Sequence, residues 1–447
     1  MNITEFQKEL LIKAMDAGFK EAEVYYEHTE TFQCMIFKGE IDSYETSEDG
    51  GLSLRGLYNG KMGYAYTEKL DEDSISFLID KAKANADVLD EDDGTDIFEG
   101  SKEYTGHKFY SQELANVPIP EKIELIKLIE KKVLAYDPRI VTLNYCILQD
   151  FSGDRVIANN KGLSIDEKKN GLIIFVSTVV KDGEEMKTGS FIKMTRDFSS
   201  LDADEIAREA AEEALSNLGE KSIPVGKYTI IMRHDAAASL LATYTPIFSA
   251  ENTQKDQSLL KGKVGEKVAS EIFTLLDGPS HPDAVTGSNF DGEGVATRKR
   301  AIVSNGTLET LLHNRKTAKM EGVETTGHAH KASYKSTLTI APQNMYIAPG
   351  KRTKEDLIAS VTNGVLITEL SGLHSGTNTI SGDFSLAAKG FYIQDGKISA
   401  PVKQMTIAGN FFDYMKEIEE IGSDIHFLPG GFGSPSLRVK ELSVTVD

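Results

Sequence analysis

The sequence has no tryptophan and only two cysteines among its 447 residues. Both cysteines, Cys34 and Cys146, fall within apolar runs of strand-like character. Such positions predict buried free thiols rather than a disulfide, a zinc site or a nucleophile. The sequence also lacks any run close to the ~18–20 consecutive apolar residues of a membrane span, and residues 1–5 do not resemble a signal peptide. We therefore expect a cytoplasmic protein with no membrane segment.

Basic residues are scarce: 49 lysines and arginines stand against 69 aspartates and glutamates, which leaves a formal net charge of −20. A phosphate backbone repels a chain this acidic unless basic residues gather on one face. The basic clusters are residues 298–300 and the scattered Arg315, Lys316 and Lys319, and both are typical of solvated surfaces. The sequence therefore disfavours direct binding of nucleic acid.

Residues 1–220 are predicted to form an α+β domain of antiparallel sheets flanked by helices. Helices are expected over residues 4–17, 75–86, 123–133 and 204–218, where apolar residues recur every three or four positions. Asn2 with Glu5, and Asp202 with Glu205, have the spacing of a capping box. The order helix, strands, helix occurs twice, in residues 1–90 and 120–220, and suggests a structural duplication. The acidic run at residues 90–94 predicts a surface connection.

The strands between these helices are predicted from alternation with a period of two, as at Phe32, Cys34 and Ile36. Glycine, in most cases beside asparagine or aspartate, marks the turns that we expect between strands, at residues 50–51, 59–60, 159–162, 170–171 and 181–183. Antiparallel hairpins flanked by helices indicate an α+β fold rather than a doubly wound parallel sheet.

Residues 221–447 are predicted to form a second domain in which strands dominate. A strand at 228–232 precedes a helix at 236–248 that Pro246 interrupts, and a short helix is expected after Thr353. Residues 371–385 combine glycines, hydroxyls, one imidazole and one carboxylate, between a predicted strand at 365–370 and strands at 390–393 and 397–402. This composition predicts a loop, and an ordinary surface hairpin explains it as well as a functional site does.

Two groups of residues in this domain have side chains capable of chemistry. His374 and Asp383 within the loop are candidates for an acid/base or ligand pair, although the histidine can equally pin a glycine-rich loop by hydrogen bonding. A triad with Ser375 or Ser381 has no supporting Gly-x-Ser-x-Gly motif.

The second group is His328-Ala329-His330, which places two imidazoles on one face if the segment is a strand. The alternative is a solvated loop. Glu251 and Asp291 are candidate site carboxylates that are equally well explained as caps or turn residues.

Together with Pro401-Val402, residues 406–410 and residues 421–424, the 371–385 run resembles the C-terminal signature of the TldD/PmbA family. Members of this family were once described as modulators of DNA gyrase and are now regarded as peptide-maturing metalloproteases. The resemblance implies a C-terminal domain that is a distorted, barrel-like antiparallel structure. It also implies, for the catalytic members, a helical His-Glu-x-x-x-His motif in which two imidazoles hold a metal and the glutamate acts as base.

That motif is absent from all 447 residues. The nearest sequence, residues 234–239, has His234-Asp235 but a serine in place of the second histidine. Alignment without gaps from the strand at 229–232 instead places the motif on residues 242–247. Ala242, Thr243 and Ile247 then occupy the positions of the ligands and the base, and none of them suits a metal. The cysteine that active members carry near the C-terminus is also missing from residues 429–434.

This pattern is similar to the TldE/PmbA branch, the subunit that pairs with a metal-bearing TldD. The resemblance therefore implies a non-catalytic subunit of a TldD/TldE-type metalloprotease complex in peptide or protein maturation or degradation. It implies no metal or other cofactor on this chain, a dimer with a TldD-type subunit or with itself, and an extended peptide as substrate. The residues expected near the substrate cleft are Glu251, Asn252, Gly327, His328, His374, Ser375, Gly376, Ser381, Gly382, Asp383 and Asn410.

Two other functions stay open from the sequence. The chain can be an autonomous metallopeptidase with substituted ligands, for which His328, His330, His374 and Asp383 are the candidates. It can also be a regulatory protein without enzymatic activity that binds gyrase or a toxin–antitoxin partner.

Overall fold

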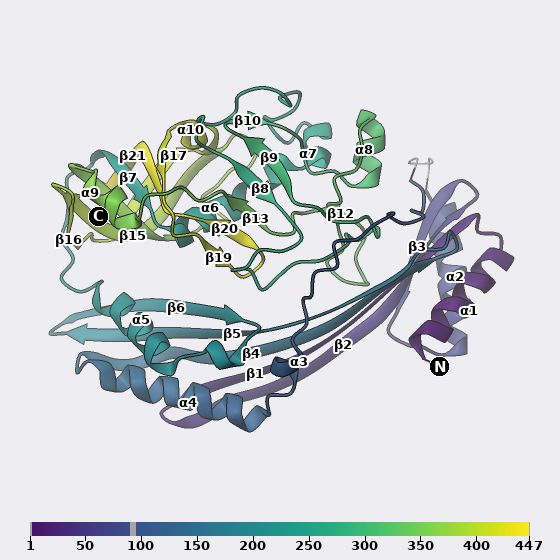
Figure 1. The fold of residues 1–447 in the computed structure, drawn as a ribbon, viewed down its shortest axis with the longest axis horizontal. Coiled ribbons are helices and arrows are strands. Elements are labelled where there is room, and N and C mark those ends of the chain that lie inside the picture. The colour runs from purple at the N-terminus through teal and green to yellow at the C-terminus, as the bar shows by residue number, and fades with distance from the viewer. Residues whose placement is uncertain (1, 90–94, 447) are drawn as a thin grey trace.

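A long, curved sheet forms the first half of the protein, and the second half lies against its concave face (Figure 1). The computed structural model describes residues 2–89 and 95–446, so the predicted acidic connection at 90–94 lies outside the described residues. The strands of the curved sheet are β1 (Glu21–Phe37), β2 (Glu40–Tyr58), β3 (Lys61–Thr67), β4 (Ile140–Asn159), β5 (Ser164–Asp182) and β6 (Glu185–Thr195). They are all antiparallel, in the order β3-β2-β1-β4-β5-β6.

The helices of the first half pack on the convex face of this sheet. They are α1 (Ile3–Asp16), α2 (Glu72–Asp87), α3 (Gln112–Ala115), α4 (Ile119–Tyr136), η1 (Phe198–Ser200) and α5 (Ala203–Leu215). Residues Phe32, Cys34 and Ile36 of β1 alternate into the core beneath α4 and α5, as their period of two predicts. A second core joins α1 and α2 to the other end of the sheet.

The order helix, strands, helix is therefore present in both predicted segments, whereas their duplication and the domain division at residue 220 stay predictions. The predicted capping box of α1 is confirmed, because Asn2 and Glu5 exchange both hydrogen bonds. At α5 the prediction is wrong in part: Asp202 accepts from the backbone of Asp204 and forms no box with Glu205. Both cysteines are buried and free, as predicted.

Two predicted turns are wrong, since residues 50–51 lie inside β2 and residues 170–171 lie inside β5. The hairpin turn at Asn59-Gly60 is confirmed, with both residues at positive φ. Gly51 and Gly171 instead allow the second half of the chain to approach the sheet closely. A Cβ on Gly51 would collide with the ring of Tyr334, and one on Gly171 would lie 2.6 Å from Val285 Cγ1.

A closed barrel forms the centre of the second half. Its strands are β7 (Gly226–Met232), β14 (Asn363–Ser371), β15 (Asp383–Gln394), β17 (Met405–Asn410) and β21 (Leu437–Val446), with β16 (Lys397–Pro401) and β18 (Ile418–Ile421) attached. The pairing of β14 with both β7 and β15 closes the ring. This confirms the predicted barrel-like β domain, and only the β7–β14 pair in this ring is parallel.

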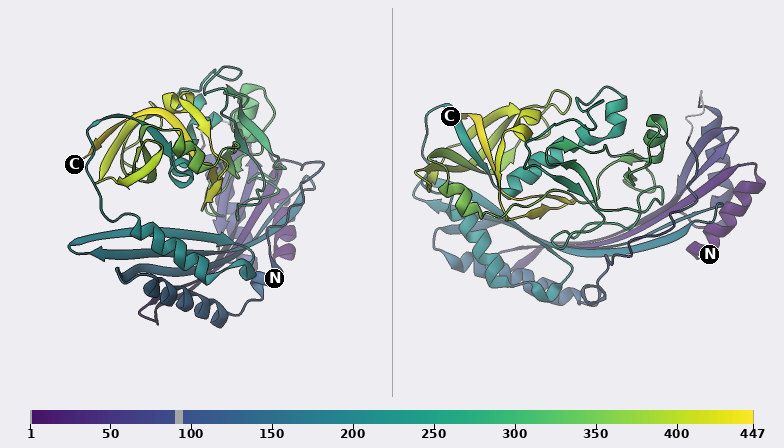
Figure 2. Two further views of the ribbon diagram at one scale, coloured as in Figure 1. Left: turned by 60° about the vertical axis from the view of Figure 1, so that its left-hand side comes forward. Right: turned by 45° about the horizontal axis from the view of Figure 1, so that its top comes forward.

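A second sheet packs beside the barrel and is ordered β10-β9-β8-β13-β20-β19. Its strands are β8 (Leu275–Asp277), β9 (Arg300–Ser304), β10 (Thr307–Leu308), β13 (Met345–Ile347), β19 (His426–Leu428) and β20 (Phe432–Ser434); β11 (Ala329–His330) pairs with β12 (Thr339–Ile340). The helices here are α6 (His234–Tyr244), η2 (Thr245–Phe248), α7 (Ala250–Gln254), α8 (Arg315–Glu321), α9 (Lys354–Ala359) and α10 (Phe411–Lys416). Figure 2 shows this half over the sheet from two further sides. None of the described helices is long and apolar enough to cross a membrane.

Candidate functional site

Helix α6 follows strand β7 directly and carries the positions where the family's metal motif would lie. Pro246 ends the α-helix as predicted, and the chain continues as the short 3₁₀-helix η2. Thr243 donates its hydroxyl to the backbone oxygen of Ser239 at 2.9 Å, and Ile247 is fully buried in the core. Ala242 has no donor atom in its side chain. The three positions therefore do not fit a metal ion.

A hollow of about 410 Å³ opens at the C-terminal end of α6, and we call it the α6 groove. Ala242 lies in its wall together with Pro246, Leu312, Ile340, Pro342 and Phe432, which make the lining largely apolar. Glu251 and Asn252, predicted at the cleft, do line this groove. Glu251 forms an ion pair with Lys255 at 2.6 Å, and the Asn252 amide donates to the Pro246 carbonyl at 2.8 Å. Both side chains are thus held by their own neighbours.

The glycine-rich loop between β14 and β15 is tied together by its own hydrogen bonds. Asp383 accepts from the Ser381 hydroxyl at 2.7 Å and from the Asn410 amide at 2.9 Å. These contacts, Asn410 first, hold the pKa of Asp383 below its usual value. A Cβ on Gly382, which has a φ of +87°, would lie 2.5 Å from the ring of Phe412. The loop therefore has a clear structural role.

The loop reaches α6 but lies apart from the lining of the α6 groove. The Tyr244 hydroxyl at the end of α6 donates to the backbone oxygen of Asp383 at 2.7 Å. Gly376 donates its N–H to Gly372 and accepts from Ser385, while Ser375 donates its hydroxyl to the Gly372 carbonyl. None of the predicted loop residues is among those that line the groove.

His374 is exposed, and within the described residues it forms no hydrogen bond or ion pair with Asp383. The predicted acid/base pair is therefore not formed. Neither Ser375 nor Ser381 contacts an imidazole, since their hydroxyls bond the Gly372 carbonyl and Asp383. A serine triad at this loop is not assembled.

His328 is buried, and both of its ring nitrogens are engaged. Nε2 lies 2.9 Å from Asp277 Oδ2, and Nδ1 lies 2.8 Å from the Thr326 hydroxyl. His330 is exposed and lies in β11, which pairs with β12, so the two imidazoles are in different surroundings and the segment is not the solvated loop of the alternative. Gly327, with a φ of +74°, makes the turn that leads into this buried position. His328 thus ties two distant segments together.

Sequence reasoning missed a buried network of charges between the concave face and residues 288–336, which we call the closed junction. Arg55 of β2 lies 2.9 Å from Glu23 of β1 and 3.7 Å from Glu293. Burial, reinforced by Glu293, raises the pKa of Asp291 to about 7. Burial, reinforced by Arg55, lowers the pKa of Lys331 to about 7. The available signal was Glu21, Glu23 and Glu27 at alternate-face positions of β1, and the single arginine Arg55 in an otherwise uncharged part of β2.

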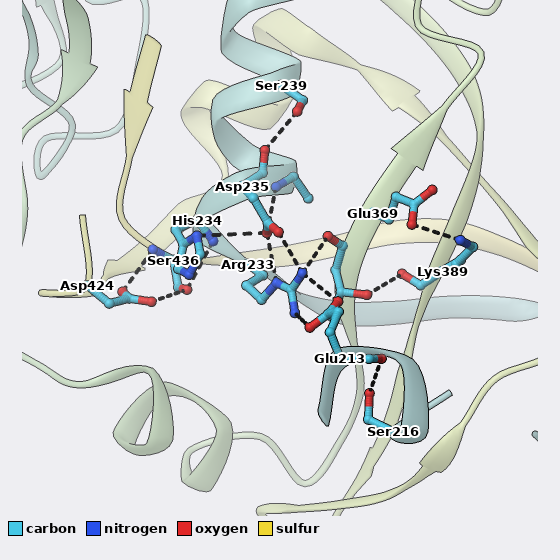
Figure 3. Close-up of polar contacts among 12 residues, drawn as sticks. Glu213, Ser216, Arg233, His234, Asp235, Ser239, Glu369, Lys389, Asp424 and Ser436 are labelled. Carbon is cyan, nitrogen blue, oxygen red and sulfur yellow. Dashed lines mark hydrogen bonds and ion pairs between the residues drawn. The ribbon is translucent and has the colours of Figure 1, made fainter. Parts of the chain in front are cut away.

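A second polar cluster lies at the start of α6 (Figure 3). Arg233 binds Glu213 of α5 through two hydrogen bonds of 2.9 Å and also binds Asp235. Burial lowers the pKa of His234 to about 4, against the raising effect of Asp235. The ring of His234 lies 4.9 Å from that of His426, whereas Ser239 donates to the Asp235 carbonyl and faces away. The look-alike of the metal motif is therefore a link between the two halves of the chain.

One group in the described part of the chain has the spacing of metal ligands. His28 and Glu30 of β1 and Glu48 of β2 have ligand atoms that all lie within 4.8 Å of one another. His28 Nε2 and Glu48 Oε1 are 2.9 Å apart. The group lies on the first-half sheet, far along the chain from α6, and exposed carboxylates of this kind are common without a metal.

Comparison with known proteins matches three successive parts of the chain to models of one family. Models of the PmbA/TldA metallopeptidase family match residues 22–86 (domain 1), 112–218 (central domain) and 225–446 (C-terminal domain). An uncharacterized protein of Methanocaldococcus jannaschii is 31% identical over 92% of this chain and 93% of its own length. Metalloprotease PmbA of Escherichia coli O157:H7 is 24% identical, over 94% of this chain and 93% of that protein.

Solved structures agree with this comparison. A protein of Thermotoga maritima described as a putative modulator of a DNA gyrase superposes with a TM-score of 0.92 and 34% identity, over 99% of this chain and 100% of that one. TldE of Thermococcus kodakarensis has the same fold, with a TM-score of 0.90 and 23% identity over 98% of this chain and 100% of its own.

Proposed function

The chain belongs to the PmbA/TldD metallopeptidase family, and from that premise we propose that it is the subunit that lacks the metal. It pairs with a TldD-type subunit, or with itself, and serves in the maturation or degradation of peptides and proteins. The observation that carries the proposal is the set of residues at the three motif positions, of which Ala242 lines the α6 groove. Where catalytic members hold two imidazoles and a glutamate, this chain has Ala242, Thr243 and Ile247.

The α6 groove supports a role in shaping a peptide cleft rather than in cleaving peptides. Its apolar wall of Leu312, Ile340 and Phe432 suits apolar side chains of an extended peptide. Glu251 is the one acidic side chain of that lining, and no histidine or cysteine accompanies it. One carboxylate already paired with Lys255 is a poor metal site. The metal is therefore expected on the partner.

The relatives by themselves leave the catalytic role open, because they include proteins named PmbA and proteins named TldD. A decisive experiment purifies the chain without a metal-binding tag or a chelator and determines its metal content by elemental mass spectrometry. We expect far less than one transition metal per chain. We also expect proteolysis of an unfolded substrate only after a TldD-type subunit is added, together with a complex of both subunits in size-exclusion chromatography.

The variant His28→Ala is the control for this measurement, because it removes the one ligand group with metal spacing in the described residues. Metal near one per chain that survives His28→Ala, with proteolysis by the chain alone, would contradict the proposal. That result would favour an autonomous metallopeptidase. A stable complex with gyrase and no proteolysis in any mixture would favour a regulatory protein instead.

A further inference from the structure

The convex face of the curved sheet has a stretch of polar side chains between its two groups of helices. α1 and α2 pack at one end of the sheet, over Val24 of β1, and α4 and α5 pack at the other end, over Phe32 (Figure 1). Alternate residues of a strand share a face, so His28 and Glu30 lie on the convex face between these two cores. Neither residue is buried. We call this part of the sheet the polar stretch.

The polar stretch brings three ligand side chains together from two neighbouring strands. Glu30 of β1 is directly opposite Glu48 of β2. His28 Nε2 lies 2.9 Å from Glu48 Oε1, and one ligand atom from each of the three side chains lies within 4.8 Å of the other two. Two atoms bound to one zinc ion lie at most about 4.3 Å apart, because each lies about 2.0–2.2 Å from the metal. A small rotation of the exposed glutamates therefore closes the set around an ion.

Exposed carboxylates alone do not make a metal site, but this pair needs a cation. Like charges that face each other directly on one side of a sheet destabilise the strand pair. Among the described residues, no lysine or arginine forms an ion pair with Glu30 or Glu48, and the partner of Glu48 is His28. The neighbouring Asp154, opposite His28 on β4, has Lys168 as its own partner. A bound dication removes the repulsion that the two glutamates are left with.

Gly50 gives the imidazole its position beside the carboxylates. It is directly opposite His28, and a Cβ added to it would lie only 3.1 Å from His28 Cδ2. The ring therefore lies across the glycine, with Nε2 directed at Glu48. Gly50 lies within β2 rather than in the predicted turn, and it makes room on the convex face as Gly51 does for Tyr334 on the concave face. The third ligand is thus held in place by the strand itself.

The two glutamates also line a hollow of about 580 Å³ on the same face. Thr46 and Ser152 contribute polar groups to its lining, and Val117 contributes part of an apolar wall. This room accommodates the water molecules that complete the coordination of an ion held by three protein ligands. Magnesium and calcium take oxygen ligands, whereas an imidazole suits zinc and its neighbours among the transition metals. The donor set therefore selects an ion of the zinc type.

We propose that His28, Glu30 and Glu48 bind one divalent transition metal of the zinc type, which clamps β1 to β2 in the polar stretch. Residues 44–49 of β2 are all exposed, so little burial holds this part of the strand, and the metal supplies a cross-link there. The site goes beyond the proposed function, because none of its residues lines the α6 groove. Exposed ligands without a buried supporting shell release their metal readily, so the purified chain holds little of it.

Titration calorimetry of the full chain with zinc chloride, after removal of tag and bound metal, tests the ligand set. We expect one zinc ion per chain, bound about tenfold or more weakly by His28→Ala and by Glu30→Gln. His374→Ala removes an exposed histidine elsewhere, and Glu45→Gln removes an exposed glutamate on the opposite face of β2. Both control variants should bind zinc as the wild type does. Equal binding by all four variants would mean an adventitious ion only and would overturn the proposal.

This outcome is separable from the outcome for the proposed function. A chain that fails to bind zinc at the polar stretch can still pair with a TldD-type subunit, and zinc bound there should give the chain alone no proteolysis. The proposed function fails instead on metal that survives His28→Ala together with proteolysis by the chain alone.

Hydrogen exchange tests the clamp. Saturating zinc should slow exchange about tenfold at the amides of residues 44–49 in the wild type, because local opening of β2 then breaks a metal bond. Glu48→Gln should show no such protection, and residues 61–67 of β3 should exchange at an unchanged rate in both proteins. Magnesium at the same concentration should have no effect. Zinc that binds one per chain yet leaves exchange at residues 44–49 unchanged would overturn the clamp.

Discussion

The concave face of the curved sheet meets the second half of the chain in two different ways. At the closed junction, around Arg55 and Asp291, side chains from both halves are buried together and fill the contact. A hollow of about 820 Å³ lies between the two halves where residues 191–197 face residues 425–427, and we call it the edge groove. Arg196 and Arg233 are among the residues that join the two halves beside it. One sheet thus provides both a fixed contact and an open one.

The difference separates what holds the halves together from what is left for a ligand. Buried charges are costly to desolvate and are tolerated only when their partners stay in place, so the closed junction fixes the two halves in one arrangement. The open junction leaves backbone groups of β6 without partners, and such groups favour association with another chain.

Removing Arg55 should have the largest effect, because it breaks the closed junction. Arg55→Ala leaves Glu23 and Glu293 buried without their cation. We expect a loss of about 3–5 kcal/mol in the free energy of unfolding, as for other broken buried pairs. Denaturation with urea measures it. Arg139→Ala, which removes an exposed partner of Asp137, is the control and should leave the midpoint unchanged. Equal effects of the two variants would remove the contrast between buried and exposed pairs.

Lys331 should make stability depend on pH. In the folded chain its pKa is lowered to about 7 by burial and by Arg55, against Glu23 and Glu27, whereas an unfolded lysine titrates near 10.4. Between these values the unfolded state binds more protons, so stability should rise with pH, by about 1 kcal/mol per pH unit. Below pH 7 this contribution is constant. Asp291, with its pKa raised to about 7, has the opposite slope between about pH 4 and 7.

The measurement compares urea denaturation of the wild type and of Lys331→Met across pH 4–10. The variant should lack the rise above pH 7, and Asp291→Asn should keep it while losing the fall below pH 7. The difference between curves isolates each group from the other titrating residues. A rise above pH 7 that is as steep in Lys331→Met as in the wild type would show that Lys331 is not its cause.

Gly51→Ala should disturb the same junction by steric means. The added Cβ would collide with the ring of Tyr334, which is 1% exposed and has no room to move. Overpacking of this kind costs about 1–3 kcal/mol. Gly226→Ala, where the nearest atom would lie 3.8 Å away, is the control. Thermal unfolding of both variants measures the effect. A neutral Gly51→Ala would mean that Tyr334 adapts and that the contact is looser than its burial indicates.

Local patterns predict much of this fold, but they do not predict the contacts between the halves. The cap at Asn2, the hairpin at Asn59-Gly60 and the interruption at Pro246 each depend on neighbours in the sequence, and each is present. Gly51 and Gly171 were read as turns because the residues that press against them, Tyr334 and Val285, lie more than a hundred positions away. Tertiary contact decides the role of such glycines.

The candidate site divides in the same way. The empty metal motif is visible in the sequence, because it concerns residue types at a fixed spacing. The pairing of His328 with Asp277 and the exposure of His374 depend on distant segments, so the sequence left the roles of both histidines open. The edge groove left no mark at all, since unpaired backbone groups have the same sequence as paired ones.

Arg196→Ala should have the smallest effect on stability, because it acts at the open junction. The variant loses two hydrogen bonds to the carbonyls of Ala284 and Val285, which solvent in the groove can replace. We expect a loss of about 1–2 kcal/mol in urea denaturation, less than for Arg55→Ala. Arg298→Ala, at an exposed arginine, is the matched control and should leave stability unchanged. A loss as large as that of Arg55→Ala would mean that the open junction carries as much of the fold as the closed one.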